Sequence, residues 1–334
     1  MYGKAIHTVA SEISKKTRKS ENVSLRSSRD RKSLEWTAIG VVGQRFGGCS
    51  EGMDVNYSVL GSGSSGNCSF LQDQTTGLLI DCGFGPRTLA VRLAAVGFTW
   101  HDVTDVLLTH THGDHWKETT FAYLFKRRVT LHLHRQHLSR LLNYSPAIKA
   151  LHDAGLTQCY QPEKRHFLDV SFSFSPFDVS HDSGRTFGFR LESPKDLFSS
   201  GWSLGYACDL GCWTPEIAGQ LVGCEILAIE FNHDQAMQRN SPRPERLIRR
   251  VLSDQGHLSN GQAAQLLSQV LSVDSPSTKA VVQLHLSQQC NQILLARQAA
   301  QQVIAQHGNH QQLFTAQQAT PINISHPRSL ANER

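Results

Sequence analysis

The pattern of apolar and polar positions predicts strands followed by helices in the first half of the chain, and the same arrangement again in the second half. Short apolar or alternating runs are typical of half-buried or buried strands, and apolar residues three or four positions apart are typical of helices. Because strands followed by helices occur in both halves, we expect two sheets packed face to face with helices outside, in a single α/β (α+β) domain. The expected strands are 57–60, 68–71, 78–80, 103–109, 129–134, 167–179, 186–191, 202–208, 225–231 and 279–284, and the expected helices are 88–96, 116–125, 136–143, 244–252, 260–271 and 292–306.

Both ends of the chain lack this pattern. Residues 1–52 are rich in Ser, Lys and Arg without sustained periodicity, so we expect a basic, disordered N-terminal extension. Met53 opens a segment that resembles a natural start, so this extension is an upstream mis-called start, a basic tail or a targeting segment. Glu12 and Glu21 disfavour a transit peptide. Residues 311–334 are polar and expected to be a loose C-terminal tail, which leaves 53–310 as the folded domain.

Composition fits a globular protein, with 39% apolar and 18% charged residues among 334. No apolar run approaches the roughly 20 residues that span a bilayer, so no membrane partner is expected. The net charge of +5 lies in residues 1–52, which hold ten Lys/Arg and five Asp/Glu, whereas the rest holds 23 of each. Net charge therefore supports a polyanionic partner only weakly. The basic runs 126–128 and 243–250 are either solvated faces or local phosphate contacts.

Eight cysteines are scattered along the chain, and none forms a Cys-x-x-Cys pair. Several lie inside apolar runs that are predicted to be strands. This distribution favours buried thiols in a reducing cytoplasm over a disulfide framework. The sequence does not indicate an oligomeric state.

The sharpest chemical feature is the segment His110-Thr-His112-Gly-Asp114-His115, which directly follows an apolar strand. Two histidines two positions apart can turn toward one point, and the following Asp and His can bend toward a second point nearby. Imidazole and carboxylate groups are ligands that zinc, manganese and iron accept. Four such residues in six positions predict a metal site.

Two metal ions need more ligands than this segment supplies. His181, Asp209 and His285 each follow an apolar strand, where side chains can converge on one edge of a sandwich. Any one of them alone is more often a turn or capping residue. Together with the histidine-rich segment, in this order, they predict a centre for two divalent cations, Zn²⁺ or Mn²⁺.

The pattern resembles the metallo-β-lactamase superfamily over about residues 55 to 305. Within it, several segments are similar to the bacterial YycJ (WalJ) branch, which is regarded as nuclease-like. The resemblance implies a four-layer αββα sandwich with its site at one edge of the strands. The matching segments are Leu60-Gly-Ser-Gly-Ser-Ser-Gly-Asn-Cys68, Leu79-Ile-Asp-Cys-Gly83, Thr109 to Trp116, Val179-Ser-His-Asp182, Glu230-Phe-Asn-His-Asp234, Gly256-His-Leu-Ser-Asn260 and Leu284-His-Leu-Ser287.

The same resemblance implies a role for each ligand residue. One metal ion would be held by His110, His112 and His181, and the other by Asp114, His115 and His285. Asp209 would bridge the two ions. Asp81 would orient the cluster from behind the ligands, as ligand histidines commonly require. Asp81 and Asp114 are therefore expected to take part in catalysis together with the pair described next.

His257 lies in a segment that resembles the loop supplying a catalytic histidine in relatives that process tRNA 3′ ends, and Glu230 would be its carboxylate partner. Such a pair can protonate a leaving oxygen; the alternative is that His257 only caps the next helix. His233 is either a contact at the edge of the site or part of a structural turn. The loop 61–67, with Ser64, Ser65 and Asn67, is either an anion cradle for substrate phosphate or a plain turn. His132 and His134 share the His-x-His spacing but lie inside a strand, which favours a structural interpretation.

Together these features predict a metal-dependent hydrolase. The first hypothesis is a nuclease or phosphodiesterase that cleaves DNA or RNA with a metal-bridging hydroxide, while His257 protonates the departing oxygen. The second is another hydrolase of the same fold, acting on a thioester, a lactone or a cyclic phosphodiester. The third is a metal-binding or nucleic-acid-binding module without turnover, which the full set of ligands disfavours.

Overall fold

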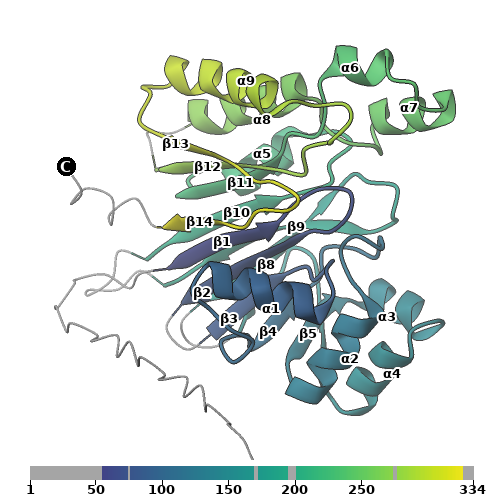
Figure 1. The fold of residues 1–334 in the computed structure, drawn as a ribbon. Coiled ribbons are helices and arrows are strands. Elements are labelled where there is room, and N and C mark those ends of the chain that lie inside the picture. The colour runs from purple at the N-terminus through teal and green to yellow at the C-terminus, as the bar shows by residue number, and fades with distance from the viewer. Residues whose placement is uncertain (1–54, 74–75, 169–171, 195–200, 274–276, 326–334) are drawn as a thin grey trace, which may run out of the picture. The chain divides into compact units, whose positions relative to one another are not determined.

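Two seven-stranded sheets pack face to face in the computed structural model, which describes residues 55–73, 76–168, 172–194, 201–273 and 277–325. The predicted extension 1–52 and the last nine residues of the predicted tail lie outside the described residues. Helices cover the outer faces of both sheets (Figure 1). The predicted four-layer αββα sandwich is therefore confirmed.

The first sheet has the strand order β14-β1-β2-β3-β4-β5-β6. Neighbours from β14 to β3 are antiparallel, whereas β3, β4, β5 and β6 run parallel. Its strands are β1 (Asn56–Gly61), β2 (Cys68–Asp73), β3 (Thr76–Ile80), β4 (Asp105–Leu107), β5 (Thr130–His134), β6 (Thr157–Tyr160) and β14 (Ile322–Ser325).

The second sheet repeats this plan in the order β13-β12-β11-β10-β9-β8-β7. Strands β7 to β10 are antiparallel neighbours, and β10 to β13 run parallel. Its strands are β7 (His166–Phe167), β8 (Ser173–Val179), β9 (Thr186–Glu192), β10 (Ser203–Ala207), β11 (Ile226–Glu230), β12 (Ala280–Leu284) and β13 (Gln312–Thr315).

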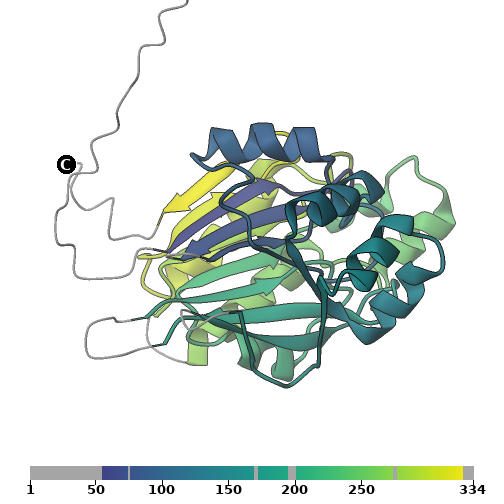
Figure 2. The same cartoon turned by 90° about the horizontal axis from the view of Figure 1, so that it is seen from below.

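Four helices pack on the first sheet, and α5, α8 and α9 pack on the second (Figures 1 and 2). The first group is α1 (Pro86–Ala95), α2 (Glu118–Arg127), α3 (Arg135–Leu142) and α4 (Pro146–Asp153). The later helices are α5 (Pro215–Leu221), α6 (Gln235–Arg239), α7 (Glu245–Leu252), α8 (Asn260–Val273) and α9 (Ile293–Gln306).

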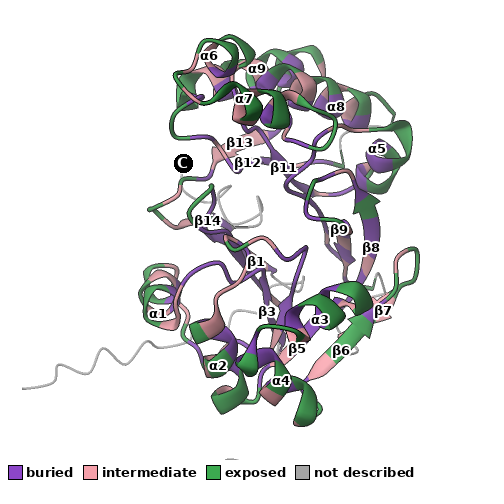
Figure 3. Cartoon of the chain, turned by 90° about the vertical axis from the view of Figure 1, so that its right-hand side faces the viewer, coloured by how far each residue is buried: buried purple, intermediate pink, exposed green. Residues whose placement is uncertain are grey.

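Alternation along the strands divides the apolar side chains between separate cores. In β3, Leu78 and Ile80 point into the core between the sheets, whereas Leu79 points into the core under the first group of helices. This follows from the two-residue period of a strand. In Figure 3 most strands are buried, except edge strands such as β6, β7 and β13, while the outward faces of the helices are exposed. A strand buried on both faces reads as a continuous apolar run, which explains why the sequence pattern was clear there.

The prediction of a loose tail from residue 311 is wrong for the described part of that segment. Strand β13 pairs with β12 at the edge of the second sheet, and β14 pairs with β1 at the edge of the first. Ile324 is fully buried in the core between the sheets. These strands are short and their neighbours are polar, so their own pattern is weak. Their stability comes from pairing with strands far away in the sequence, which periodicity does not reveal.

Helices α4, α5 and α6 and strand β6 were not predicted. Helices α4 and α5 carry a recognisable start signal, because Ser145 and Thr214 accept hydrogen bonds from the amides of Ile148 and Ile217, and a proline follows each cap. Both helices are no longer than eight residues, which is too short for a clear apolar period.

No helix in the described ranges is long and apolar enough to cross a membrane. Seven described cysteines are free thiols, and five of them are buried. Cys49 lies outside the described residues.

Candidate metal centre

Parallel strands from both sheets end at one edge, and polar residues follow those ends directly. Asp81, Asp209 and His285, after β3, β10 and β12, have φ angles of 60°, 57° and 55°. This left-handed region is uncommon for residues other than glycine, and each such residue costs on the order of 1–3 kcal/mol. The sharp turn lets each side chain leave the strand toward the space between the sheet edges. Three such residues at one edge indicate that the fold is held there for a function.

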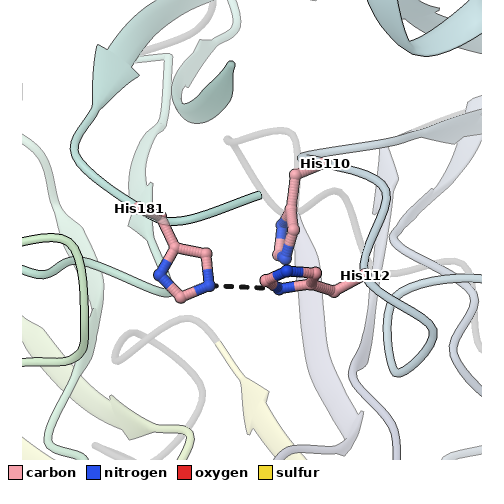
Figure 4. A group of neighbouring side chains, drawn as sticks. All are labelled: His110, His112 and His181. Atoms are coloured by element: carbon pink, nitrogen blue, oxygen red, sulfur yellow. Dashed lines mark hydrogen bonds between the residues drawn. The ribbon is translucent and has the colours of Figure 1, made fainter. Parts of the chain in front are cut away.

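The first group consists of His110, His112 and His181, whose candidate ligand atoms all lie within 4.8 Å of one another. Figure 4 shows the three rings gathered together, and Nε2 of His181 lies 3.2 Å from Nδ1 of His112. Nδ1 of His181 lies 2.9 Å from the carbonyl oxygen of Gly256, to which it can donate its proton. That bond leaves the Nε2 lone pair of His181 directed into the group.

The second group consists of Asp114, His115 and His285. Nε2 of His115 and Nε2 of His285 each lie 3.7 Å from Oδ2 of Asp114. Behind His115, its Nδ1 lies 2.7 Å from Oδ2 of Asp81. Asp81 is itself held by the amide and hydroxyl of Thr109. This contact fixes the ring of His115 so that Nε2 faces the group, which is how a carboxylate commonly orients a ligand histidine.

Asp209 lies between the two groups. Its Oδ2 is 2.6 Å from Nε2 of His115 and 3.8 Å from Nε2 of His110. Its Oδ1 is 2.7 Å from Nδ1 of His285. One carboxylate therefore faces ring nitrogens of both groups.

Several of these buried atoms have no hydrogen-bond partner among the described residues: Nε2 of His110, Nε2 of His285 and both carboxylate oxygens of Asp209. Ring nitrogens approach Asp209 closely, but without the geometry of a hydrogen bond. Each buried unsatisfied group costs about 1–3 kcal/mol, so four at one place point to a missing ligand. Imidazole and carboxylate donors suit divalent transition metals. The residues present therefore fit a pair of such cations.

Mutual charge neutralisation sets the pKa values of this metal-free cluster. Burial raises the pKa of Asp209, but His285 and His115 outweigh burial and hold that pKa well below its usual range. Burial lowers the pKa of His115, but Asp81 and Asp209 raise it well above the usual value. Burial, aided by His115, lowers the pKa of His110 well below normal. In the absence of cations, protons on some of the rings balance the buried carboxylates.

Half-buried His257 and buried Glu230 form a pair beside Asp209. Nδ1 of His257 is 2.8 Å from Oε1 of Glu230 and 3.3 Å from Oδ1 of Asp209. The other oxygen of Glu230 accepts the amides of Leu210 and Leu258. Burial lowers the pKa of His257, but Glu230 and Asp209 raise it to about 9. Burial raises the pKa of Glu230, but His257 lowers it to about 2.

The same pair also belongs to a group, with Asp209 and His285, whose ligand atoms lie within 4.8 Å of one another. Both oxygens of Glu230 already face hydrogen-bond donors, and its Oε1 lies 2.9 Å from Nδ1 of His285. Glu230 is therefore better placed to support the two histidines than to bind a cation. Gly256 precedes His257 where an added Cβ would lie 2.2 Å from the carbonyl oxygen of Val251, so only glycine fits that turn.

The loop 61–67 lies against the second group. Asn67 is buried, and its side-chain amide lies 3.4 Å from Oδ2 of Asp114 and 3.1 Å from Nε2 of His115. Its carbonyl oxygen accepts the amide of Gly63. These contacts engage the side chain of Asn67 within the protein, whereas Ser64 and Ser65 are exposed. Asn67 thus positions the loop and the ligands, and the two serines are the accessible members.

His233 and His132 are both buried away from the surface. Burial lowers the pKa of His233 to about 4, and neither of its ring nitrogens has a hydrogen-bond partner among the described residues. The amide of Asn260 donates to the backbone oxygen of His233, which ties the turn after β11 to the start of α8. Nε2 of His132 lies 2.7 Å from Oδ1 of Asp105, which supports the structural interpretation of that histidine.

The site also contains a pair that the sequence did not single out. Oδ1 of Asp182 lies 3.6 Å from Nε2 of His112 and 3.5 Å from Nε2 of His181. Asp182 is in turn held by Arg250 of α7, whose Nη2 is 3.0 Å from Oδ1. Asp182 lies in the quoted segment Val179 to Asp182, and Arg250 ends the basic run 243–250. The two residues come from separate segments of the sequence, so neither segment alone predicts their contact.

Comparison with known proteins identifies relatives of this chain. The family model described as the beta-lactamase superfamily domain matches residues 76–286. Exodeoxyribonuclease YycJ of Bacillus anthracis is 27% identical over 262 residues, which cover 77% of this chain and 91% of the relative. Exodeoxyribonuclease WalJ of Streptococcus pneumoniae is 28% identical over 236 residues, which cover 70% of this chain and 82% of the relative.

Among solved structures, the metallo-beta-lactamase fold protein YhfI from Bacillus subtilis superposes with a TM-score of 0.56. The match covers 81% of this chain and all of YhfI, at 13% sequence identity. At that identity the likeness concerns the fold alone.

Proposed function

This chain belongs to the beta-lactamase superfamily, and we propose that within it the protein is a metal-dependent nuclease that hydrolyses phosphodiester bonds of nucleic acid. Two observations support the proposal. Curated relatives at 27% and 28% identity are named exodeoxyribonucleases. Within the structure, the proposal is supported most by the contact of His257 with Glu230 and Asp209, since a protonated ring there could donate a proton next to the proposed bridging carboxylate.

We assign the ligand residues to the two cations according to the groups described above. His110, His112 and His181 would hold one divalent cation, Zn²⁺ or Mn²⁺, and Asp114, His115 and His285 the other. Asp209 would contact both. When bound, the two cations would supply Lewis acidity at the reacting phosphate and at the attacking water.

The remaining residues of the site hold or move protons. Asp81 keeps the ring of His115 in the orientation that directs Nε2 to the centre. Against the effect of burial, Glu230 and Asp209 raise the pKa of His257 to about 9 in the absence of cations, which favours a protonated ring near neutral pH. The departing oxygen of a phosphodiester needs a proton, and protonated His257 can donate it. Ser64 and Ser65 are the exposed members of the loop 61–67 that we propose contacts substrate phosphate.

The direct test is a panel of end-labelled substrates. Single- and double-stranded DNA and RNA are incubated with the purified protein and either Zn²⁺ or Mn²⁺, next to an aryl phosphodiester, a thioester and a lactone. We expect cleavage of nucleic acid and of the aryl phosphodiester, and loss of both in Asp209→Ala. Hydrolysis of the thioester or lactone alone would refute the nuclease proposal while leaving a hydrolase. Metal binding without any turnover would refute both.

A further inference from the structure

A cavity opens at the same edge of the first sheet, away from the proposed metal ligands. It has a volume of about 350 Å³ and lies where β5 and β6 end, lined by His134, Arg135, Tyr160, Gln161 and Arg185. Figure 3 shows α3, β5 and β6 next to one another at this place. Because β4, β5 and β6 run parallel, this cavity lies on the same side as the turn after β4 that carries His110. Neighbouring strands are about 4.8 Å apart, so β6 ends roughly 10 Å from the end of β4.

The cavity is basic. Arg135 is exposed at the first position of α3, where the helix dipole adds positive potential. Nη2 of Arg185 lies 2.7 Å from Oδ2 of Asp178, and its buried Nε has no hydrogen-bond partner among the described residues. Burial, and then the guanidinium of Arg185, lower the pKa of His134, so this ring is neutral near pH 7. The positive charge therefore comes from two guanidinium groups, only one of which faces a carboxylate.

One short loop connects this cavity to the metal centre. The loop 180–185 carries His181 in the first ligand group and Arg185 in the cavity. Helix α3 holds the loop in place, because Nη1 of Arg140 donates to the carbonyl oxygen of Ser183 and Nε2 of His137 lies 2.7 Å from that of Arg185. His137 is buried. The spacing between cavity and metal centre is thus fixed by packing and hydrogen bonds.

We propose that this cavity binds a backbone phosphate of the nucleic-acid strand whose scissile bond lies at the metal centre. The proposal rests on the nuclease function proposed above and adds a second contact between the protein and the nucleic-acid strand. Guanidinium groups bind phosphate oxygens through charge-assisted hydrogen bonds. A separation of roughly 10 Å is several times the axial rise of about 3.4 Å per nucleotide, so the cavity would hold a phosphate other than the scissile one. The cavity therefore distinguishes an oligonucleotide from a dinucleotide.

The test measures binding without cleavage. Fluorescein-labelled oligonucleotides of two, four and eight residues, as DNA and as RNA, are titrated with full-length protein in EDTA at several KCl concentrations. In Arg135→Gln and Arg185→Gln, we expect the gain in affinity from two to eight nucleotides to shrink about tenfold. The slope of log K against log salt should fall by about 0.7 for each lost phosphate contact.

Matched variants control for charge and folding. Lys126 is an exposed residue in the last turn of α2, ahead of β5 in the chain. Lys126→Gln removes one positive charge there and should keep the wild-type affinities and salt slope. Arg135→Lys and Arg185→Lys keep the charge and should keep most of the slope. Unchanged length dependence and slope in both glutamine variants would overturn the proposal. If wild-type protein cleaves no phosphodiester, the proposed function fails; if it cleaves oligonucleotides but the glutamine variants bind them as wild type does, only this inference fails.

Discussion

Nδ1 of His257 lies 2.8 Å from Oε1 of Glu230, and this contact predicts how activity depends on pH. The pKa of His257 is raised to about 9 in the metal-free protein, so the ring is protonated below that pH and neutral above it. Cations bound next to it would lower this pKa. We therefore expect kcat/KM for an oligonucleotide to fall along an alkaline limb at or below about pH 9.

Glu230→Gln should move this limb to lower pH, because Glu230 is the main group that raises the pKa of His257. His257→Ala should abolish the limb and slow turnover by about 10²–10⁴-fold, the usual worth of a proton donor. Metal content, measured in parallel, should stay at the wild-type level in His257→Ala. An unshifted limb in Glu230→Gln would contradict the role of the pair.

Asp209 contacts both ligand groups, so its removal should have the largest effect of any single carboxylate. Asp209→Ala removes the atoms that face His115, His110 and His285. We expect turnover to fall by at least about 10³-fold, since cations contribute several kcal/mol to stabilisation of the transition state. The measurement pairs the rate with the metal content per chain. Full activity in Asp209→Ala would exclude the bridging role.

Asp81 and Asp105 offer a matched comparison. Each carboxylate lies 2.7 Å from a histidine nitrogen, but only the partner of Asp81, His115, faces the proposed centre. We expect Asp81→Asn to weaken metal affinity about 10–100-fold, the usual effect of losing the group that orients a ligand histidine. Asp105→Asn should leave metal affinity unchanged. Competition with a coloured chelator measures both, and equal affinities in the two variants would contradict the positioning role of Asp81.

Metal binding should release protons and stabilise the fold. His115 and His285 have pKa values well above normal in the metal-free protein, so they carry protons at pH 7 that bound cations must displace. Metal affinity should therefore rise with pH and fall as pH is lowered. Calorimetry in buffers with different ionisation enthalpies measures the released protons. Chelation should lower the melting temperature, because a ligand at 100 times its Kd contributes about 2.7 kcal/mol to stability.

The sequence predicted those parts of the protein that depend on local patterns. Strands such as β11 and β12 are largely apolar runs buried on both faces, and the residue after β12, His285, is a proposed ligand. The resemblance implied that Asp81 supports the cluster, and the structure places it against His115. Contacts between distant segments were not predictable in this way. The pair of Asp182 and Arg250 and the cavity beside Arg135 and Arg185 arise only when loops from different elements meet.

The edge strand β14 was missed for the same reason, and its main apolar contact can be tested. Ile324 is fully buried between the sheets, so Ile324→Ala should lower the free energy of unfolding by about 2–5 kcal/mol. Ile293 is 44% exposed, and Ile293→Ala should cost much less. Denaturant unfolding of both variants measures the difference. Equal losses would contradict the burial of β14.

Pairing of β1 with β14 joins Asn56 to Ser325, so the first described strand finds one neighbour only at the far end of the chain. During synthesis on a ribosome, one edge of β1 stays unpaired until Ile322–Ser325 has emerged. Contacts of such long sequence separation slow folding, and an open edge invites pairing with other nascent chains. We therefore expect refolding to be slow and dependent on protein concentration, with yields that improve at high dilution or with a chaperone.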